Sequence, residues 1–307
     1  MITKIKSKNT TWIDIKNPRD KDVDYLAKKF PFIHKTVLEE LIPPGHRAKV
    51  ERHKDYMFLI LYYPIFNPAH KTTQSREVDI IVTKDHIITS HYKTLIPLKK
   101  LLDQVNLYSE KKEEYLSNGA GVLLHHLIIG MLDSAFNKLD IVEKNIDDIE
   151  NAIFDGKEKE MVQGISLTKR DILNFRRILA PQHAVLESLS SEGIEFFGKD
   201  IAPYMEDILG YYSRVWNLIE DQRETIQALS ETNDSLLNAK INEIIKVLTL
   251  FSVIVFPLTL LSGIWGMNTD YLPLVALPAP WDFLAVMGIM ILLTAGMLLF
   301  FKKKKWL

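Results

Sequence analysis

Residues 265–268 read Trp-Gly-Met-Asn, and this short break separates two long apolar runs near the end of the sequence. The run before it, Val247 to Trp265, has nineteen residues without a charge, and the run after it, Trp281 to Phe301, carries only Asp282. Each run is about long enough to cross the roughly 30 Å hydrocarbon core of a membrane as a helix. Because the connection between them is short, the two runs predict a membrane hairpin whose far turn holds Gly266, Met267 and Asn268.

The lysines that flank this hairpin predict its orientation. Lys240 and Lys246 precede the first run and four lysines follow the second at 302–305, whereas residues 266–280 contain neither Lys nor Arg. Since positively charged flanks stay on the cytoplasmic side, we expect both termini in the cytoplasm and residues 266–280 outside. The polar residues 1–10 lack the apolar core of a signal peptide, so we expect a multi-pass protein of the cell (inner) membrane whose first two thirds stay cytoplasmic.

Composition excludes several classes of protein. The 307 residues suffice for a sizeable domain beside the hairpin, and a net charge of −1 gives no overall positive field for nucleic acid. The absence of cysteine excludes disulfides and thiolate metal sites. The sequence contains no glycine-rich phosphate loop, no nucleophile elbow and no His-Glu-x-x-His run. We therefore expect no enzymatic activity, no organic cofactor and no nucleic-acid partner.

Residues 1 to about 95 predict a small α/β layer. Strand-like segments alternate with short helical ones and are bounded by turn residues; the strands are expected at 11–15, 56–63, 77–82 and 86–91 and the helices at 23–30 and 35–41. From Pro97 onward the pattern is helical, with one long helix at 116–153 and an antiparallel partner at 161–190. His125 and His126 point about 100° apart on such a helix and cannot chelate one ion together, so we expect a structural role for both.

One uninterrupted helix should enter the membrane, because neither Gly nor Pro occurs between Gly210 and Pro257. Pro257 itself should kink or loosen this helix near Val253. Its membrane-depth positions are almost purely apolar outside a set at heptad spacing, here named the hydroxyl stripe: Asn242, Ile245, Thr249, Ser252, Phe256, Thr259 and Gly263. Such a stripe either packs against other helices through small residues or lines a water-filled path, and the spacing alone leaves both open.

An aromatic residue followed by Gly-Met-Asn, at the end of the first of two C-terminal membrane helices, resembles the CorA family of divalent-cation channels. The segments 246–249 (Lys-Val-Leu-Thr) and 256–259 (Phe-Pro-Leu-Thr) and the tail 302–307 are similar as well. The resemblance implies an α+β membrane protein with a cytoplasmic α/β domain, a long stalk helix and a two-helix transmembrane hairpin. It also implies a homopentamer, surrounded by membrane lipid, whose stalk helices line the pore with the hydroxyl stripe.

The resemblance further implies passive uptake of Mg²⁺, with Co²⁺ or Ni²⁺ also passing. Gly266, Met267 and Asn268 would form the selectivity filter, because neutral amide oxygens can accept hydrogen bonds from the water shell that Mg²⁺ holds tightly. Asp270 would enrich cations at the mouth. Two positions near the proposed filter depart from the family pattern: Trp265 stands where Tyr is usual, and Leu274 stands where a second loop acid often follows.

Regulation is implied by two further segments. Asp55, which follows Arg-Ala-Lys-Val-Glu at 47–51, and Asp207, in Tyr-Met-Glu-Asp at 204–207, match the family segments that carry the acids of an intersubunit site. Intracellular Mg²⁺ would bridge these acids and close the channel. The four lysines Lys302, Lys303, Lys304 and Lys305 would form a basic collar at the inner mouth or would simply anchor the helix in lipid headgroups.

Two other functions stay open at this point. One is a zinc transporter of the same superfamily, although a pore without a His or Cys ligand favours Mg²⁺. The other is a membrane-anchored sensory or scaffold protein, which would need neither the hydroxyl stripe nor Asn268.

We expect a cytoplasmic α/β domain with a helical pair at 1–202, a stalk helix at 203–246, transmembrane helices at 247–265 and 281–301, an external loop at 266–280 and a basic tail at 302–307.

Overall fold

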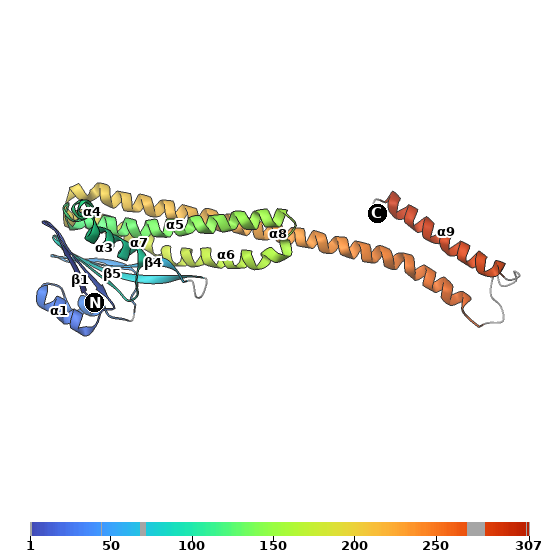
Figure 1. Cartoon of the computed structure of the whole chain (residues 1–307), viewed down its shortest axis with the longest axis horizontal. Coiled ribbons are helices and arrows are strands. Elements are labelled where there is room, and N and C mark those ends of the chain that lie inside the picture. The colour runs from blue at the N-terminus through green and yellow to red at the C-terminus, as the bar shows by residue number, and fades with distance from the viewer. Residues whose placement is uncertain (1, 44, 68–71, 269–279, 305, 307) are drawn as a thin grey trace. The chain divides into compact units, whose positions relative to one another are not determined.

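The computed structural model describes residues 2–43, 45–67, 72–268, 280–304 and 306. The chain divides into two units, Met1–Glu231 and Thr232–Leu307, here named the N-terminal and the C-terminal unit. An N-terminal α/β domain, one long helix and two C-terminal helices were expected, and this order of elements is confirmed (Figure 1).

A six-stranded sheet forms the centre of the N-terminal unit, with the strand order β1-β2-β6-β5-β4-β3. Neighbouring strands are antiparallel except β2 and β6, which are parallel. The strands are β1 (Ile2–Lys6), β2 (Thr11–Lys16), β3 (Lys49–Arg52), β4 (Met57–Asn67), β5 (Thr72–Val82) and β6 (His86–His91).

Both faces of this sheet are covered, which explains why β4 is apolar along most of its length. Phe58 and Ile60 belong to a core shared with α1 (Asp20–Lys29) and α2 (Lys35–Glu39). Leu59 and Leu61 are equally buried and point to the opposite face, because side chains alternate along a strand. On that face lie helices of the second half of the unit (Figure 1).

Those helices form an antiparallel arrangement in which α5 (Ala120–Phe154) packs along α6 (Glu158–Leu179). The turn between them depends on Gly156, whose φ of 86° is in the left-handed region. The helix expected at 161–190 is in fact two helices, α6 and α7 (Gln182–Phe197). The break falls at Pro181, because proline has no N–H to donate to the preceding turn. The other helices of the unit are α3 (Ile96–Leu107), α4 (Ser109–Leu116) and a 3₁₀ turn at Lys199–Ile201.

The helix α8 (Ala202–Trp265) is continuous, as expected from its lack of Gly and Pro between 210 and 257. In the N-terminal unit it buries a face with helical spacing that includes Met205, Ile208 and Val215. Two side chains also bond it to its neighbours: the Tyr212 hydroxyl donates to the Leu179 carbonyl at 2.9 Å, and the Gln222 amide donates to the Leu139 carbonyl at 2.9 Å.

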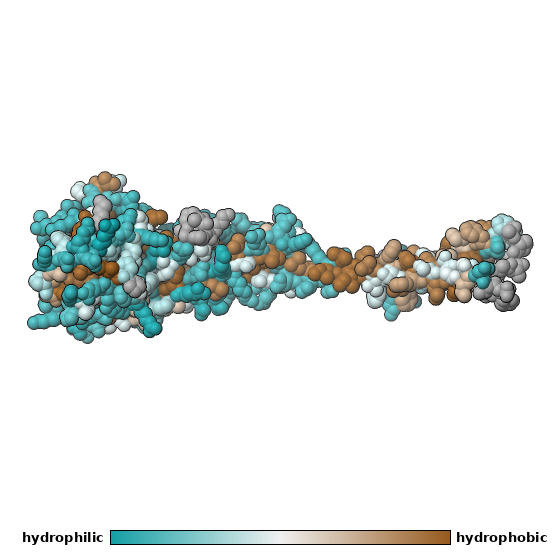
Figure 2. Space-filling model, turned by 90° about the horizontal axis from the view of Figure 1, so that it is seen from below, coloured by the Kyte–Doolittle hydropathy of each residue, from teal (hydrophilic) through white to brown (hydrophobic). Residues whose placement is uncertain are grey.

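The C-terminal unit consists of the rest of α8 and of α9 (Trp281–Lys303). Their side chains are mostly apolar and exposed, and Figure 2 shows brown surface over much of this part of the chain. By length and composition three described helices could cross a membrane. In α5 that apolar window is 56% buried inside the protein, whereas in α8 and α9 it is 6% and 0% buried. Only the last two therefore leave an apolar surface that needs a lipid or protein covering.

Candidate functional site

The tripeptide that was expected at the far turn lies where α8 ends. The Gly266 amide donates to the Ser262 carbonyl at 2.9 Å and the Met267 amide donates to the Ile264 carbonyl at 3.2 Å, so the helical hydrogen bonds continue through the first two residues. Asn268 follows and is exposed. Asp270 lies outside the described residues.

The small size of Gly266 matters at the end of α8. Its φ is not in the left-handed region, so the position does not need the conformational freedom of glycine. A Cβ atom at this position would lie 3.0 Å from the Ser262 carbonyl oxygen. The small residue therefore avoids crowding of the last helical turn rather than supplying an unusual backbone conformation.

The hydroxyl stripe lies on the exposed surface of α8, with six of its seven positions exposed and Ser252 half-buried. The hydroxyls of Thr249, Ser252 and Thr259 donate to the carbonyls four residues earlier, at 2.8, 2.9 and 3.0 Å. This corrects part of the sequence argument, because hydroxyls that bond to their own helix do not need water or protein to satisfy their protons. The stripe is compatible with a pore but does not require one.

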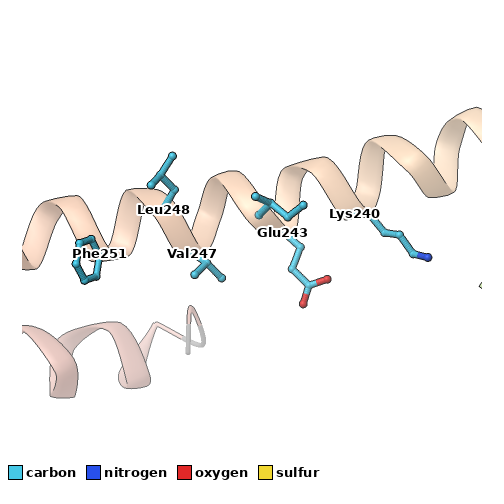
Figure 3. Close-up of a pocket in the computed structure, with 6 residues that line it drawn as sticks. Lys240, Glu243, Val247, Leu248 and Phe251 are labelled. Carbon is cyan, nitrogen blue, oxygen red and sulfur yellow. The ribbon is translucent and has the colours of Figure 1, made fainter. Parts of the chain in front are cut away.

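A groove of about 700 Å³ runs along α8 upstream of the stripe's centre. Figure 3 shows Lys240 and Glu243 at one end of it and Val247, Leu248 and Phe251 at the other. The surface of the helix thus changes from charged to apolar within about three turns. Such a change is typical of a helix that passes from water into a membrane interface.

The basic cluster ends α9. Lys302 and Lys303 occupy its last turn and Lys304 follows as the C-terminal cap, and all three are exposed. Cations at this end interact favourably with the helix dipole. Lys305 lies outside the described residues.

Asp55 lies in the turn that joins β3 to β4 and is exposed. The turn is fixed on both sides: Arg52 forms ion pairs with Glu192 and Glu195 of α7, and the His53 ring stacks on Tyr56 with centroids 4.3 Å apart. A carboxylate on a fixed, exposed turn is available to a cation or to another chain.

Asp207 lies near the start of α8, with its side chain 55% exposed, and it has a partner that the sequence did not indicate. The His125 ring of α5 contacts it, with 2.8 Å between Nε2 and the carboxylate oxygen Oδ2. His126 lies beside Tyr115 instead, with ring centroids 4.4 Å apart. Burial, followed by the neighbouring His125, lowers the pKa of His126.

Asp55 and Asp207 make no hydrogen bond or ion pair with each other in the part of the chain that the structure describes. Within the same residues, no group of three or more His, Cys, Asp or Glu side chains is close enough to hold a metal ion. One chain therefore offers, at most, part of a regulatory cation site, and the rest of the ligands would have to come from water or another subunit.

A second group of ionisable side chains lies inside the sheet and was not predicted. Asp79 of β5 is fully buried, and its carboxylate oxygens receive no hydrogen bond from a donor among the described residues. Beside it, Glu77 accepts a hydrogen bond from the Tyr62 hydroxyl at 2.7 Å. Burial and the adjacent carboxylate of Glu77 raise the pKa of Asp79 to about 9. The alternation of β5 places both acids on one face, which the sequence could have shown.

The chain is similar to known metal-ion transporters over nearly its whole length. It is 29% identical over 305 residues to the cobalt/magnesium transport protein CorA of Thermotoga maritima, which covers 98% of this chain and 84% of that protein. It is 20% identical over 303 residues to the zinc transport protein ZntB of Pectobacterium carotovorum subsp. carotovorum, which covers 99% of this chain and 90% of that protein.

The structure resembles the complete structure of the CorA magnesium transporter from Methanocaldococcus jannaschii with a TM-score of 0.84. That match covers 99% of this chain and 93% of the other at 23% identity, and it shows a shared fold. Residues 7–303, which span most of both units, match the family model described as CorA-like Mg2+ transporter protein. The resemblance seen in the Gly-Met-Asn tripeptide is thereby confirmed, and the chain belongs to the family of CorA-like Mg²⁺ transporters.

Proposed function

We propose that the chain forms a homopentameric channel for passive Mg²⁺ uptake, which also passes Co²⁺ or Ni²⁺. The observation that carries the proposal is the end of α8, where Asn268 is exposed beyond an apolar helical segment of which the described residues bury only 6%. The family is one of Mg²⁺ transporters, and the Thermotoga maritima relative carries cobalt as well as magnesium in its name.

The proposed filter is a ring of Asn268 side chains, one from each subunit. Mg²⁺ gives up its water shell reluctantly, so a ring of carboxylates would hold the ion too strongly, whereas neutral amide oxygens can accept hydrogen bonds from the bound water. Asp270 would raise the local cation concentration. Entry into an inside-negative cell releases about 4.6 kcal/mol per 100 mV for a divalent ion, which drives uptake without ATP.

In this proposal α8 lines the pore and α9 contacts lipid. Residues 247–265 and 281–301 cross the inner membrane, residues 266–280 face outside, and both ends of the chain face the cytoplasm. The change from charged to apolar side chains along the α8 groove supports a membrane boundary near Val247. The lysines at 302–304 support a cytoplasmic end for α9.

The proposed regulation is closure by intracellular Mg²⁺ bound between Asp207 of one subunit and Asp55 of the next. Carboxylate oxygens are the ligands that Mg²⁺ prefers, and both side chains are exposed in the single chain. Bound Mg²⁺ would offset the repulsion between facing acids and hold the subunits together. When internal Mg²⁺ falls, the acids would repel and the ring would loosen.

Ion flux into liposomes tests the channel. Asn268→Ala should abolish Mg²⁺ uptake without loss of the pentamer, whereas Asn217→Ala, the same substitution at an exposed position of α8 in the N-terminal unit, should leave uptake unchanged. Normal uptake by Asn268→Ala would refute the filter. Uptake of Zn²⁺ without Mg²⁺ by the parent would instead favour a zinc transporter, as in the ZntB relatives. No flux of any divalent ion would favour an anchor or scaffold.

A further inference from the structure

We infer that His125 and Asp207 form a mixed imidazole–carboxylate pair of ligands for a transition-metal ion such as Co²⁺, Ni²⁺ or Zn²⁺. The consequence would be that these ions close the channel at lower concentrations than Mg²⁺ does. The closure part of this inference rests on the proposed function, in which Asp207 holds the regulatory cation, while the binding part rests on the pair itself.

The distance within the pair suits a shared metal ion. The His125 Nε2 atom and the Asp207 Oδ2 atom are 2.8 Å apart. Adjacent ligands of an octahedral ion with bonds of about 2.1 Å lie about 3.0 Å apart. The two atoms would therefore separate by only a few tenths of an ångström when an ion replaces the proton between them.

The histidine ring is held in place, so little ordering is needed before it binds. His125 is 8% exposed, and its ring makes edge contacts with His126 at 5.1 Å and with Tyr204 at 5.2 Å between centroids. Its other nitrogen, Nδ1, is buried and makes no hydrogen bond with the described residues. Asp207 is the hydrogen-bond partner of the ring at Nε2, so Nε2 is the nitrogen that would exchange its proton for a metal ion. Asp207, in contrast, is more than half exposed and can be reached by an ion from solvent.

The chemistry of the ligands decides which ion the pair binds more tightly. Mg²⁺ prefers oxygen ligands, whereas imidazole nitrogen suits Zn²⁺, Ni²⁺ and Co²⁺. An intersubunit site made only of carboxylates and water would respond mainly to Mg²⁺. A histidine beside one of the carboxylates of this site adds affinity for Zn²⁺, Ni²⁺ and Co²⁺ and little affinity for Mg²⁺. The remaining positions would be filled by water and by Asp55 of a neighbouring subunit.

Binding is tested first, with the full chain and with Co²⁺ as a spectroscopic probe. Co²⁺ bound through an imidazole has a visible absorption spectrum that differs from that of Co²⁺ bound only to oxygen. His125→Gln keeps a hydrogen-bond donor for Asp207 but removes the imidazole, and Asp207→Asn removes the carboxylate from an exposed position. Both should lose the Co²⁺ spectrum. The matched control His126→Gln, which alters the adjacent ring outside the pair, should keep it.

Closure is then measured by protection from proteolysis and by flux, with internal Ni²⁺ or Mg²⁺ titrated separately. His125→Gln should raise the protecting Ni²⁺ concentration about tenfold or more and leave the Mg²⁺ concentration within about twofold. A parallel shift for both ions would show that His125 only positions Asp207, and an unchanged Co²⁺ spectrum would show that it binds no metal; either result overturns the inference. The double variant Asp55→Asn/Asp207→Asn distinguishes failure of the proposed Mg²⁺ gating from failure of the proposed metal-binding pair. If Mg²⁺ still protects it, the proposed gating fails, and the Co²⁺ spectrum alone decides the metal pair.

Discussion

At the scale of single residues, Asp79 gives the clearest expectation for stability. Its raised pKa, about 9, means that the folded protein keeps a proton that the unfolded chain releases above about 4. The free energy of unfolding should therefore fall as pH rises between these values, by at most about 1.4 kcal/mol per pH unit. Burial is the main cause, and the carboxylates of Glu77 and Glu40 add to it.

Asp79→Asn removes this dependence, because the amide has no proton to lose. Thermal unfolding of the full chain in detergent should show the variant gaining stability relative to the parent as pH rises from 5 to 8. The difference between the two proteins isolates Asp79 from other titrating groups. An equal difference at both pH values would show that Asp79 does not hold a proton in the folded state.

His125 shows the limit of prediction from sequence at this scale. Adjacent histidines on one helix were expected not to chelate one ion together, and both were assigned a structural role. The contact of His125 with Asp207 joins residues 82 positions apart on two different helices. No periodicity relates such positions, because the contact depends on how α5 and α8 pack. Asp55 and Asp207 themselves were found only through the family resemblance, and their joint site stays a prediction.

At the scale of elements, the turn after α5 depends on one glycine. Gly156 adopts a φ of 86°, and a Cβ at such an angle costs about 1 kcal/mol. Gly156→Ala should lower the free energy of unfolding by that amount. Gly210→Ala provides the matched control, since Gly210 lies inside α8 with open space at its Cβ position and should gain about 0.5–1 kcal/mol. Thermal unfolding of the full chain measures the expected loss of stability in Gly156→Ala and the expected gain in Gly210→Ala. A loss of stability in both variants would contradict the role assigned to the φ of Gly156.

The basic end of α9 is expected to serve membrane insertion rather than gating. Replacing the four lysines at 302–305 with glutamine should reduce correct insertion and leave the flux per inserted protein unchanged, because in the proposed topology their charge keeps this end in the cytoplasm. The sequence has no cysteine, so Trp306→Cys offers one unique label for the orientation. Thiol labelling from each side measures insertion, and liposome flux measures transport. Altered flux with normal insertion would instead favour a gating collar.

Most elements could be predicted from periodicity and from Gly and Pro. The exceptions have physical reasons. The strand β1 was not expected, because Lys4 and Lys6 break its apolar pattern, yet it pairs with β2 at the edge of the sheet, where lysines are common. β3 was not expected either, since it is short and only half-buried and its pairing with β4 forms it. The break between α6 and α7 at Pro181 was obscured by apolar spacing that continues on both sides.

At the scale of the whole molecule, the proposed pentamer predicts which face of α8 meets its copies. Ser252→Cys lies on the hydroxyl stripe, and Val253→Cys lies about 100° away on the same turn. Under mild oxidation Ser252→Cys should form disulfide-linked dimers in membranes, whereas Val253→Cys should form far fewer. Since the parent has no cysteine, each cross-link reports one position. Equal cross-linking by both variants would mean that the stripe does not face the axis.

If the stripe lines the pore as proposed, its hydroxyls have a consequence for the sign of the charge on the ions that pass. Thr249, Ser252 and Thr259 each direct a proton back to a carbonyl of their own helix. Each oxygen therefore presents lone pairs, the negative end of its dipole, to whatever moves past it. A wall built from such groups accepts the protons of water around a cation and offers none to an anion. Although the stripe has no charged side chain, this surface would select ions by the sign of their charge: hydrated cations would pass and chloride would be rejected.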